Sequence, residues 1–171
     1  MLKYLKIFTL SLSLLFLSCS SIVHKKNLQL SKNKTYAISS FWNYTETPMA
    51  GLRAASIVES VLSKENLSII SFIDGNEKKT ARENKVAFLT EQITKAKKLN
   101  INYLIMGEVQ EWRYKTGIDG EPVVSYSIKV IDIQNAKILF NAVGAKSGWG
   151  HKSIGVVAQE IAATLIPQFV N

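Results

Sequence analysis

Apolar and polar residues alternate through the second half of this chain. From Val124 to Ile131, aliphatic and aromatic side chains occupy every second position, with serine and lysine between them. This period of two predicts a β-strand with one buried face. Turn-compatible residues interrupt the pattern at 134–136, and β-type sequence resumes at Ile138. Because the largely apolar stretch 103–114 precedes these two, the sequence predicts a meander of three long strands.

Three other stretches place apolar residues three and four positions apart, which is the spacing of a helix that packs one face on a core. They cover residues 49–66, 81–99 and 153–166. Lysines crowd the end of the second stretch, where the helix dipole favours positive charge, and Pro167 should end the third. The predicted core-facing residues are Gly51, Ala55, Val58 and Leu62 in the first stretch, Val86, Leu89, Ile93 and Ala96 in the second, and Ile154, Ala158, Ile161 and Leu165 in the third.

Two shorter apolar stretches, 35–42 and 67–73, complete the expected elements as strands, the second of them buried. The resulting order is βαβαβββα. We therefore predict a single α+β domain over residues 35–171, in which a mixed sheet ends in a long C-terminal meander packed by helices. A chain of this length can bury one compact core.

The N-terminus has the pattern of an export signal. Lys3 and Lys6 precede an apolar run at 7–17 that is too short to span a membrane as a helix. A serine and then Cys19 follow, which resembles a bacterial lipoprotein signal that is cut before the cysteine. We predict that residues 1–18 are removed as a signal peptide and that Cys19 carries the lipid. The alternative is an ordinary secretory signal with a cysteine nearby.

Residues 19–34 are polar and basic without any period, so we predict a lipid-anchored tether between the membrane and the domain. Position 20 is serine rather than aspartate, which resembles lipoproteins sorted to the outer membrane of Gram-negative bacteria. His24 lies in this segment and has no metal-ligating residue to pair with. We therefore expect no metal site there.

The chain is basic, with 21 Lys and Arg against 13 Asp and Glu and a net charge of +8. Removal of residues 1–18 takes away Lys3 and Lys6 and leaves +6. The basic residues are scattered, without the clustered patch that nucleic-acid binding requires, so we expect no nucleic-acid partner. Cys19 is the single cysteine, which excludes an intrachain disulfide.

No sequence pattern supports catalysis. The chain contains none of the common nucleophile, metalloprotease, phosphate-binding or dinucleotide-binding motifs. Its carboxylates cluster at Glu108, Glu111, Asp119 and Glu121. Glu108 and Glu111 are three positions apart, so on one regular strand they would point to opposite faces. We predict a protein that is not an enzyme and that uses no cofactor or metal.

The predicted loop 115–122, between the first two strands of the meander, concentrates acidic charge on a basic protein. It contains two glycines, a proline, Asp119 and Glu121. Two interpretations remain open. The loop is either an ordinary hairpin loop or an acidic surface element that meets a cationic ligand or a neighbouring subunit.

Aromatic residues mark two further candidate surfaces. Trp149 stands between two glycines in a predicted turn, where an exposed indole suits a membrane interface because its apolar ring and polar N–H are both satisfied there. The alternative is a packed hairpin corner. Trp112 and Tyr114 share one face of their predicted strand, so they could stack on sugar rings or fill a contact between subunits.

A resemblance to a known family rests on four segments: NYTETPMAGLRA (43–54), GEVQEWRYKTGIDGEP (107–122), IDIQNAKILFNAVGAKSGWG (131–150) and VAQEIAATL (157–165). Together with the lipoprotein start, they resemble the PelC family of outer-membrane lipoproteins, which serve the export of the Pel exopolysaccharide in biofilm formation. More distantly, the order of elements is similar to that of CsgG and LpoB.

The resemblance implies a homo-oligomeric ring, dodecameric in the family, that is lipid-anchored to the periplasmic face of the outer membrane. Such a ring would guide a cationic exopolysaccharide to a β-barrel exporter. By position, Cys19 would carry the lipid, Trp149 would enter the bilayer and Asp119 would line an acidic funnel, with Glu121 in the same loop. A protomer of +6 fits this role if its positive charges face lipid headgroups or the outside.

The distant likeness to LpoB suggests an alternative, a periplasmic activator of a cell-wall synthase. That role needs a long disordered tether to reach through the cell wall. Residues 20–34 are few for such a reach, since an extended chain spans at most about 3.3–3.6 Å per residue. The sequence therefore favours the export ring.

Overall fold

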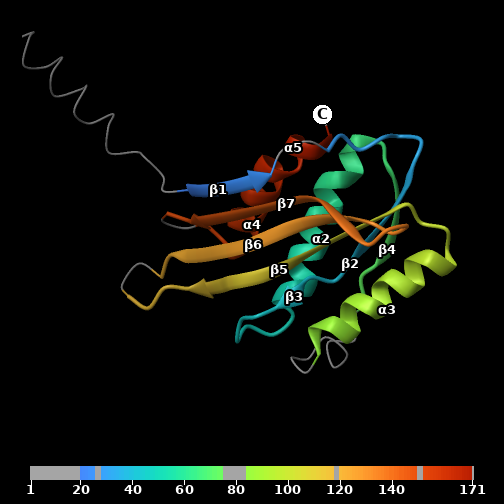
Figure 1. The fold of residues 1–171 in the computed structure, drawn as a ribbon. Coiled ribbons are helices and arrows are strands. Elements are labelled where there is room, and N and C mark those ends of the chain that lie inside the picture. The colour runs from blue at the N-terminus through green and yellow to red at the C-terminus, as the bar shows by residue number, and fades with distance from the viewer. Residues whose placement is uncertain (1–19, 26–27, 75–83, 118–119, 150–151, 171) are drawn as a thin grey trace, which may run out of the picture.

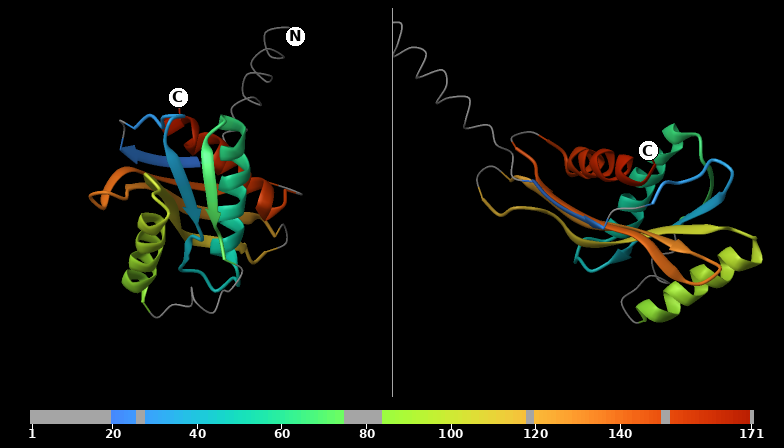
Figure 2. Two further views of the ribbon diagram at one scale, coloured as in Figure 1. Left: turned by 90° about the vertical axis from the view of Figure 1, so that its right-hand side faces the viewer. Right: turned by 45° about the horizontal axis from the view of Figure 1, so that its top comes forward.

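The computed structural model describes residues 20–25, 28–74, 84–117, 120–149 and 152–170. Among them, a twisted mixed sheet is covered by helices on both faces (Figure 1). Helices α2 and α4 lie over one face of the sheet, and α3 lies over the other (Figure 2, right). The predicted α+β fold with a C-terminal meander is confirmed.

The sequence forms seven described strands. They are β1 (Ser20–Lys25), β2 (Thr35–Ser39), β3 (Trp42–Asn43), β4 (Ser68–Phe72), β5 (Tyr103–Tyr114), β6 (Pro122–Asp132) and β7 (Lys137–Ser147). The helices are α2 (Ala50–Leu62), a 3-10 turn at Ser63–Glu65, α3 (Lys85–Lys98), α4 (Ile154–Leu165) and the short α5 (Pro167–Val170).

The strand order in the sheet is β1-β7-β6-β5-β2-β4, and β3 pairs with β5 beside this path. Strands β5, β6, β7 and β1 pair in antiparallel fashion, whereas β2 is parallel to both β4 and β5. Parallel neighbours need a long connection between them. Helix α2 supplies that connection between β2 and β4, and α3 lies between β4 and β5.

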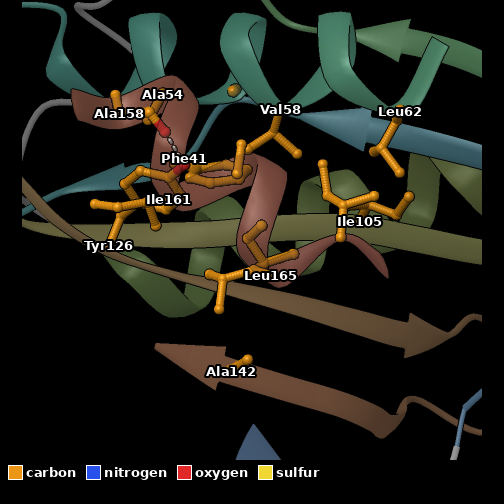
Figure 3. Packing of buried hydrophobic residues seen from close by; sticks show 14 of the residues in the cluster. Phe41, Ala54, Val58, Leu62, Ile105, Tyr126, Ala142, Ala158, Ile161 and Leu165 are labelled. Atoms are coloured by element: carbon orange, nitrogen blue, oxygen red, sulfur yellow. Dashed lines mark hydrogen bonds between the residues drawn. The ribbon is translucent and has the colours of Figure 1, made fainter. Parts of the chain in front are cut away.

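The larger core lies between the sheet and helices α2 and α4 (Figure 3). The predicted stripe of α2 is confirmed, since Gly51, Ala55, Val58 and Leu62 are all buried. In α4 the predicted Ala158, Ile161 and Leu165 are buried, and Ile154 is half-buried. The hydroxyl of Tyr126 on β6 donates to the carbonyl of Ala158 at 2.7 Å, which fixes α4 to the sheet.

The smaller core lies under α3, and here the predicted face of the helix is correct only in part, since Ala96 is buried and Leu89 and Ile93 pack partly buried against the core. The buried residues of α3 are Phe88, Gln92 and Ala96, whereas Val86 is 74% exposed. The ring of Phe88 packs against Trp42 at 5.7 Å between centroids. Because this aromatic contact orients the helix, the buried stripe is rotated away from Val86.

The predicted irregular tether is also wrong in part. Residues Ser20–Lys25 form β1, which pairs along β7 from Ser20↔Lys146 to Lys25↔Asn141. Farther along, the N–H of Leu30 donates to the carbonyl of Phe169 at 2.9 Å, and the Leu30 side chain is buried. The physical reason is that β7 would otherwise present an unpaired edge. Backbone pairing requires no hydrophobic period, so the sequence pattern did not reveal it.

Two smaller features differ from the prediction. The strand predicted at 35–42 divides into β2 and β3, because the N–H of Phe41 leaves the sheet and donates to the carbonyl of Gly51 at 3.3 Å. Strand β4 is an edge strand rather than a buried one, and its Ile70 is 43% exposed. Helix α4 ends at Leu165, so the predicted stop before Pro167 is confirmed, and Pro167 itself begins the short helix α5, as proline can at a first helical position.

Candidate functional site

Several candidate residues lie at one end of the sheet, which we call the Trp149 end. Strand β5 stops there at Tyr114, β6 starts opposite it at Pro122, and β7 stops at Ser147 beside the start of β6. Strand β1 also starts at this end, since Ser20 pairs with Lys146. The four strand ends are on the left of Figure 1.

Trp149 is the most exposed large apolar residue of the described part of the chain, at 79%. The preceding residue, Gly148, is buried, and its N–H donates to the carbonyl of Pro122 at 2.7 Å. A Cβ atom on Gly148 would lie only 2.6 Å from Pro122 Cγ and 2.8 Å from Val157 Cγ2. The backbone is therefore packed tightly while the next side chain projects outward, although the membrane role of Trp149 stays a prediction.

The predicted shared surface of Trp112 and Tyr114 does not exist in the protomer. Trp112 is only 2% exposed and packs in the larger core with Val124 and Val157. Tyr114 is 51% exposed, and its hydroxyl accepts from the N–H of Ile154 at 3.3 Å. Because Trp112 is buried, its ring offers no surface for stacking on a sugar in this structure.

The acidic loop joins β5 to β6 at the Trp149 end. Asp119 lies outside the described residues. Glu121 forms an ion pair with Lys115, with 2.8 Å between Lys115 Nζ and Glu121 Oε2. The N–H of Lys115 also donates to the carbonyl of Glu121 at 2.8 Å. The negative charge of Glu121 is therefore matched within the loop itself.

The expectation that Glu108 and Glu111 point to opposite faces is wrong. The pairing of β5 with β6 shifts between Val109 and Glu111, so that Gln110 is the extra residue of a β-bulge. An extra residue reverses which face of the sheet each later side chain points to. Glu108 and Glu111 therefore point to the same face. Each carboxylate has its own cationic partner, and Arg113 Nη2 lies 2.8 Å from Glu111 Oε1.

Glu108 is held between two lysines. Lys85 Nζ from α3 lies 2.9 Å from Glu108 Oε1, and Lys129 of β6 contacts the same oxygen. Burial opposes the ionisation of Glu108, but the hydrogen bonds from Lys129 and Lys85 outweigh it and lower the pKa of Glu108 below its ordinary value. Glu108 is therefore an ionised group with compensated charge.

A second carboxylate, Glu160 of α4, is bridged in the same way near the Trp149 end. Lys152 Nζ lies 2.6 Å from Glu160 Oε1, and Lys146 Nζ lies 2.9 Å from Glu160 Oε2. The hydrogen bond from Lys152, followed by that from Lys146, lowers the pKa of Glu160. This group of three residues carries a net positive charge, and Lys146 lies one residue before the end of β7 at the Trp149 end.

The sequence interpretation missed a hollow beside β3, which we call the Tyr44 hollow. It has a volume of ≈ 310 Å³ and is lined by Trp42, Asn43, Tyr44 and Lys85. The Tyr44 side chain is 53% exposed, and Lys85 Nζ donates to its hydroxyl at 2.9 Å. This hydrogen bond is the main cause that raises the pKa of Lys85. The available sequence signal for this hollow was Tyr44, an aromatic residue within the first segment that resembles PelC.

Two further observations concern the described residues alone. No three of their His, Cys, Asp or Glu side chains gather closely enough to hold a metal ion. None of their helices combines the length and apolar character needed to cross a membrane. Cys19, the predicted lipid attachment site, lies outside the described residues, so its role stays a prediction.

Comparison with solved structures identifies a close likeness to PelC. The PelC dodecamer from Paraburkholderia phytofirmans aligns with a TM-score of 0.75 and 29% identity, over 90% of this chain and 99% of that one. A variant of the same dodecamer in another crystal form aligns with a TM-score of 0.74 and 29% identity, over 88% and 98%. The predicted resemblance to PelC is confirmed.

A more distant structure shares the fold alone. Lipoprotein GNA1162 from Neisseria meningitidis aligns with a TM-score of 0.59 and 12% identity, over 79% of this chain and 96% of that one. The C-terminal domain of LpoB from Escherichia coli reaches a TM-score of only 0.44, which is too low to bear on function. No family model and no curated protein matches the chain.

Proposed function

We propose that this chain, which resembles the PelC dodecamers over nearly all of its described length, is a non-catalytic lipoprotein that acts as a homo-oligomeric ring. The ring lies at the periplasmic face of the outer membrane, anchored through lipid on Cys19. It guides an exopolysaccharide of the Pel type to a β-barrel exporter during biofilm formation.

The observation that carries this proposal is the arrangement of the Trp149 end. Ser20 pairs with Lys146 there, so the chain leaves the fold towards Cys19 at the end where Trp149 is 79% exposed. A lipid anchor and an indole at one end act together on a membrane surface, since stable attachment takes two signals and tryptophan favours the interface. This end of each protomer therefore faces the bilayer.

The ring itself is inferred from the PelC structures, both of which are dodecamers. A closed ring uses one surface of each subunit against a different surface of the next. At 29% identity over almost the whole of the PelC chain, we expect the same type of assembly here. The number of twelve subunits is part of the proposal.

The acidic loop supplies the proposed contact for a cationic polymer. It joins β5 to β6 at the Trp149 end, so its place in the ring is near the membrane and the exporter. Because Lys115 matches the charge of Glu121, we assign most of the attraction to Asp119. Electrostatic guidance of this kind should weaken as the salt concentration rises.

The alternative role as an LpoB-like activator receives less support. Strand β1 begins at Ser20, directly after the predicted lipid attachment site. The N–H of Leu30 is bonded to Phe169, which ties the following segment to the domain as well. Little chain remains for a spacer that would cross the cell wall.

The mass of the full-length protein in detergent, measured by light scattering, tests the ring. We expect a mass close to twelve protomers, and a stable monomer in several detergents would overturn the assembly. Deletion of the gene in its native bacterium tests the pathway. Secreted exopolysaccharide should fall and should return with the wild-type gene but not with Cys19→Ser. Normal secretion in the deletion strain would count against export.

A further inference from the structure

Two of the segments that carry the likeness to PelC, 43–54 and 107–122, are distant in sequence but meet in the fold. Strand β3 pairs with β5, with Trp42 opposite Glu108 and Asn43 opposite Val109. The N–H of Tyr44 continues the contact and donates to the carbonyl of Val109 at 3.0 Å. The Tyr44 hollow lies at this junction, and the proposed membrane contact at Trp149 does not use it.

The loop that presents Tyr44 is fixed by side-chain hydrogen bonds. Asn43 Oδ1 accepts from the N–H and the hydroxyl of Thr45 at 2.9 and 2.8 Å, and Asn43 Nδ2 donates to the carbonyl of Thr47 at 2.9 Å. The hydroxyl of Thr47 donates to the carbonyl of Trp112 in the core. An aromatic side chain held in place in this way loses little freedom when a ligand binds.

The Tyr44 ring combines an exposed aromatic surface with polar neighbours. Trp42 packs against it edge to face, with 6.4 Å between ring centroids. Lys85 Nζ lies 2.9 Å from the Tyr44 hydroxyl and 5.3 Å from the ring centroid, and it also contacts Glu108. Pockets that hold small ligands have this composition, an aromatic wall with a few fixed polar groups.

The charged groups around the hollow carry an excess of one positive charge. Glu108 contributes one negative charge, and Lys85 and Lys129 contribute two positive charges that both contact its carboxylate. A cationic ligand therefore gains no attraction there. Neutral hydroxyl and amide groups can accept hydrogen bonds from the Lys85 ammonium group, while C–H groups pack on the Tyr44 ring face.

We propose that the Tyr44 hollow binds the sugar rings of a polysaccharide through stacking on Tyr44 and hydrogen bonds to Lys85. This inference rests on the proposed function for the source of the polymer. It assigns recognition of neutral sugar units to this hollow, apart from the acidic loop that attracts a cationic chain. It also replaces Trp112 as the sugar-stacking residue.

The test uses the full-length protein in detergent and a neutral probe, the pentamer of N-acetylglucosamine. Saturation-transfer NMR suits weak binding to a large protein and gives a Kd by titration. Tyr44→Ala should raise the Kd by about tenfold or more, as loss of a stacking ring does elsewhere. Tyr44→Phe keeps the ring and should stay within about threefold of the wild type.

Tyr114→Ala is the matched control, because Tyr114 is 51% exposed against 53% for Tyr44 but lies at the Trp149 end. This variant should bind the pentamer like the wild type. Salt screens interactions between charges. Because the pentamer is uncharged, its binding should change by less than about twofold between low and high salt. The deacetylated, cationic pentamer serves as the comparison probe.

Absence of pentamer binding by the wild type would overturn the proposal, as would equal effects of Tyr44→Ala and Tyr114→Ala. Binding of the cationic pentamer alone, abolished by salt, would also overturn it, because recognition would then depend on charge. Light scattering on the same samples separates this outcome from failure of the ring. A monomer that still binds the neutral pentamer through Tyr44 would refute the ring and keep the sugar site.

Discussion

The backbone N–H of Gly148 donates to the carbonyl of Pro122 at 2.7 Å. This bond joins the turn that carries Trp149 to the residue that ends the acidic loop. The sequence interpretation assigned Trp149 to the bilayer and the acidic loop to the polymer. In the structure, both lie at one end of the sheet. In the proposed ring, the loop would act where the polymer leaves the ring for the exporter.

Replacement of Trp149 by alanine should weaken membrane binding. The effect is best measured in a Cys19→Ser background, since the lipid would otherwise hold the protein to vesicles. An interfacial tryptophan buries a large apolar surface. We therefore expect the equilibrium constant for vesicle binding, measured by flotation, to fall about tenfold. Ile138→Ala, a 50% exposed residue at the start of β7, should have no effect. Equal binding by all variants would remove Trp149 from the membrane contact.

Replacement of Gly148 by alanine should destabilise the fold. Its new Cβ atom would meet Pro122 Cγ at 2.6 Å and Val157 Cγ2 at 2.8 Å. Overpacking of this kind costs about 1–3 kcal/mol, which thermal unfolding at fixed protein concentration would detect. The control is Gly155→Ala in α4, where the nearest atom would be 3.9 Å away. That variant should be at least as stable as the wild type, since alanine loses less conformational freedom on folding than glycine. An unchanged melting temperature for Gly148→Ala would show that the turn has room to adjust.

Strong periodicity explains which elements the sequence predicted well. Strand β5 has the predicted bounds, and the stripes of α2 and α4 are buried as expected, because many apolar side chains at a regular spacing must face one core. Helix α3 offered a weaker choice. It has fewer apolar residues, and the contact between Phe88 and Trp42 decided its orientation.

The candidate site was harder to predict because it depends on pairings between distant segments. The bulge at Gln110 reverses the alternation of β5 without any sign in the hydrophobic pattern, and this error reversed the expected relation of Glu108 to Glu111. The Tyr44 hollow depends on the pairing of β3 with β5. A strand of only two residues has no hydrophobic pattern from which this pairing could be predicted. Exposure of Trp149 was foreseeable from its flanking glycines, whereas burial of Trp112 depended on the cover of the helix layer.

Removal of the Tyr126 hydroxyl should weaken the attachment of α4 to the sheet. Tyr126 is buried, and its hydroxyl donates to the carbonyl of Ala158 at 2.7 Å. Tyr126→Phe should lower the free energy of unfolding by about 0.5–1.5 kcal/mol, the usual net value of such a bond. Tyr114→Phe removes a longer bond, 3.3 Å, at an exposed position and should change stability little. A larger loss in Tyr114→Phe than in Tyr126→Phe would contradict this assignment.

Acidification should remove the stability that Glu108 contributes. The pKa of Glu108 is lowered in the folded state, where burial opposes ionisation but hydrogen bonds from Lys129 and Lys85 outweigh it. A lowered folded pKa gives stability that is fully present above the ordinary value of 4.5 and is lost as the pH falls through the folded pKa. In Glu108→Gln, the glutamine carries no charge at any pH, so this contribution to stability is absent both before and after acidification.

The variant Glu108→Gln should therefore be less stable than the wild type at pH 7, and the difference in melting temperature should narrow below about pH 4.5. Glu91→Gln, an exposed substitution on α3, controls for the general effect of lost negative charge. Its difference from the wild type should be small at both pH values, because exposed charges contribute little. A gap for Glu108→Gln that stays constant from pH 7 to pH 3 would mean that the two lysines do not stabilise the fold through the Glu108 charge.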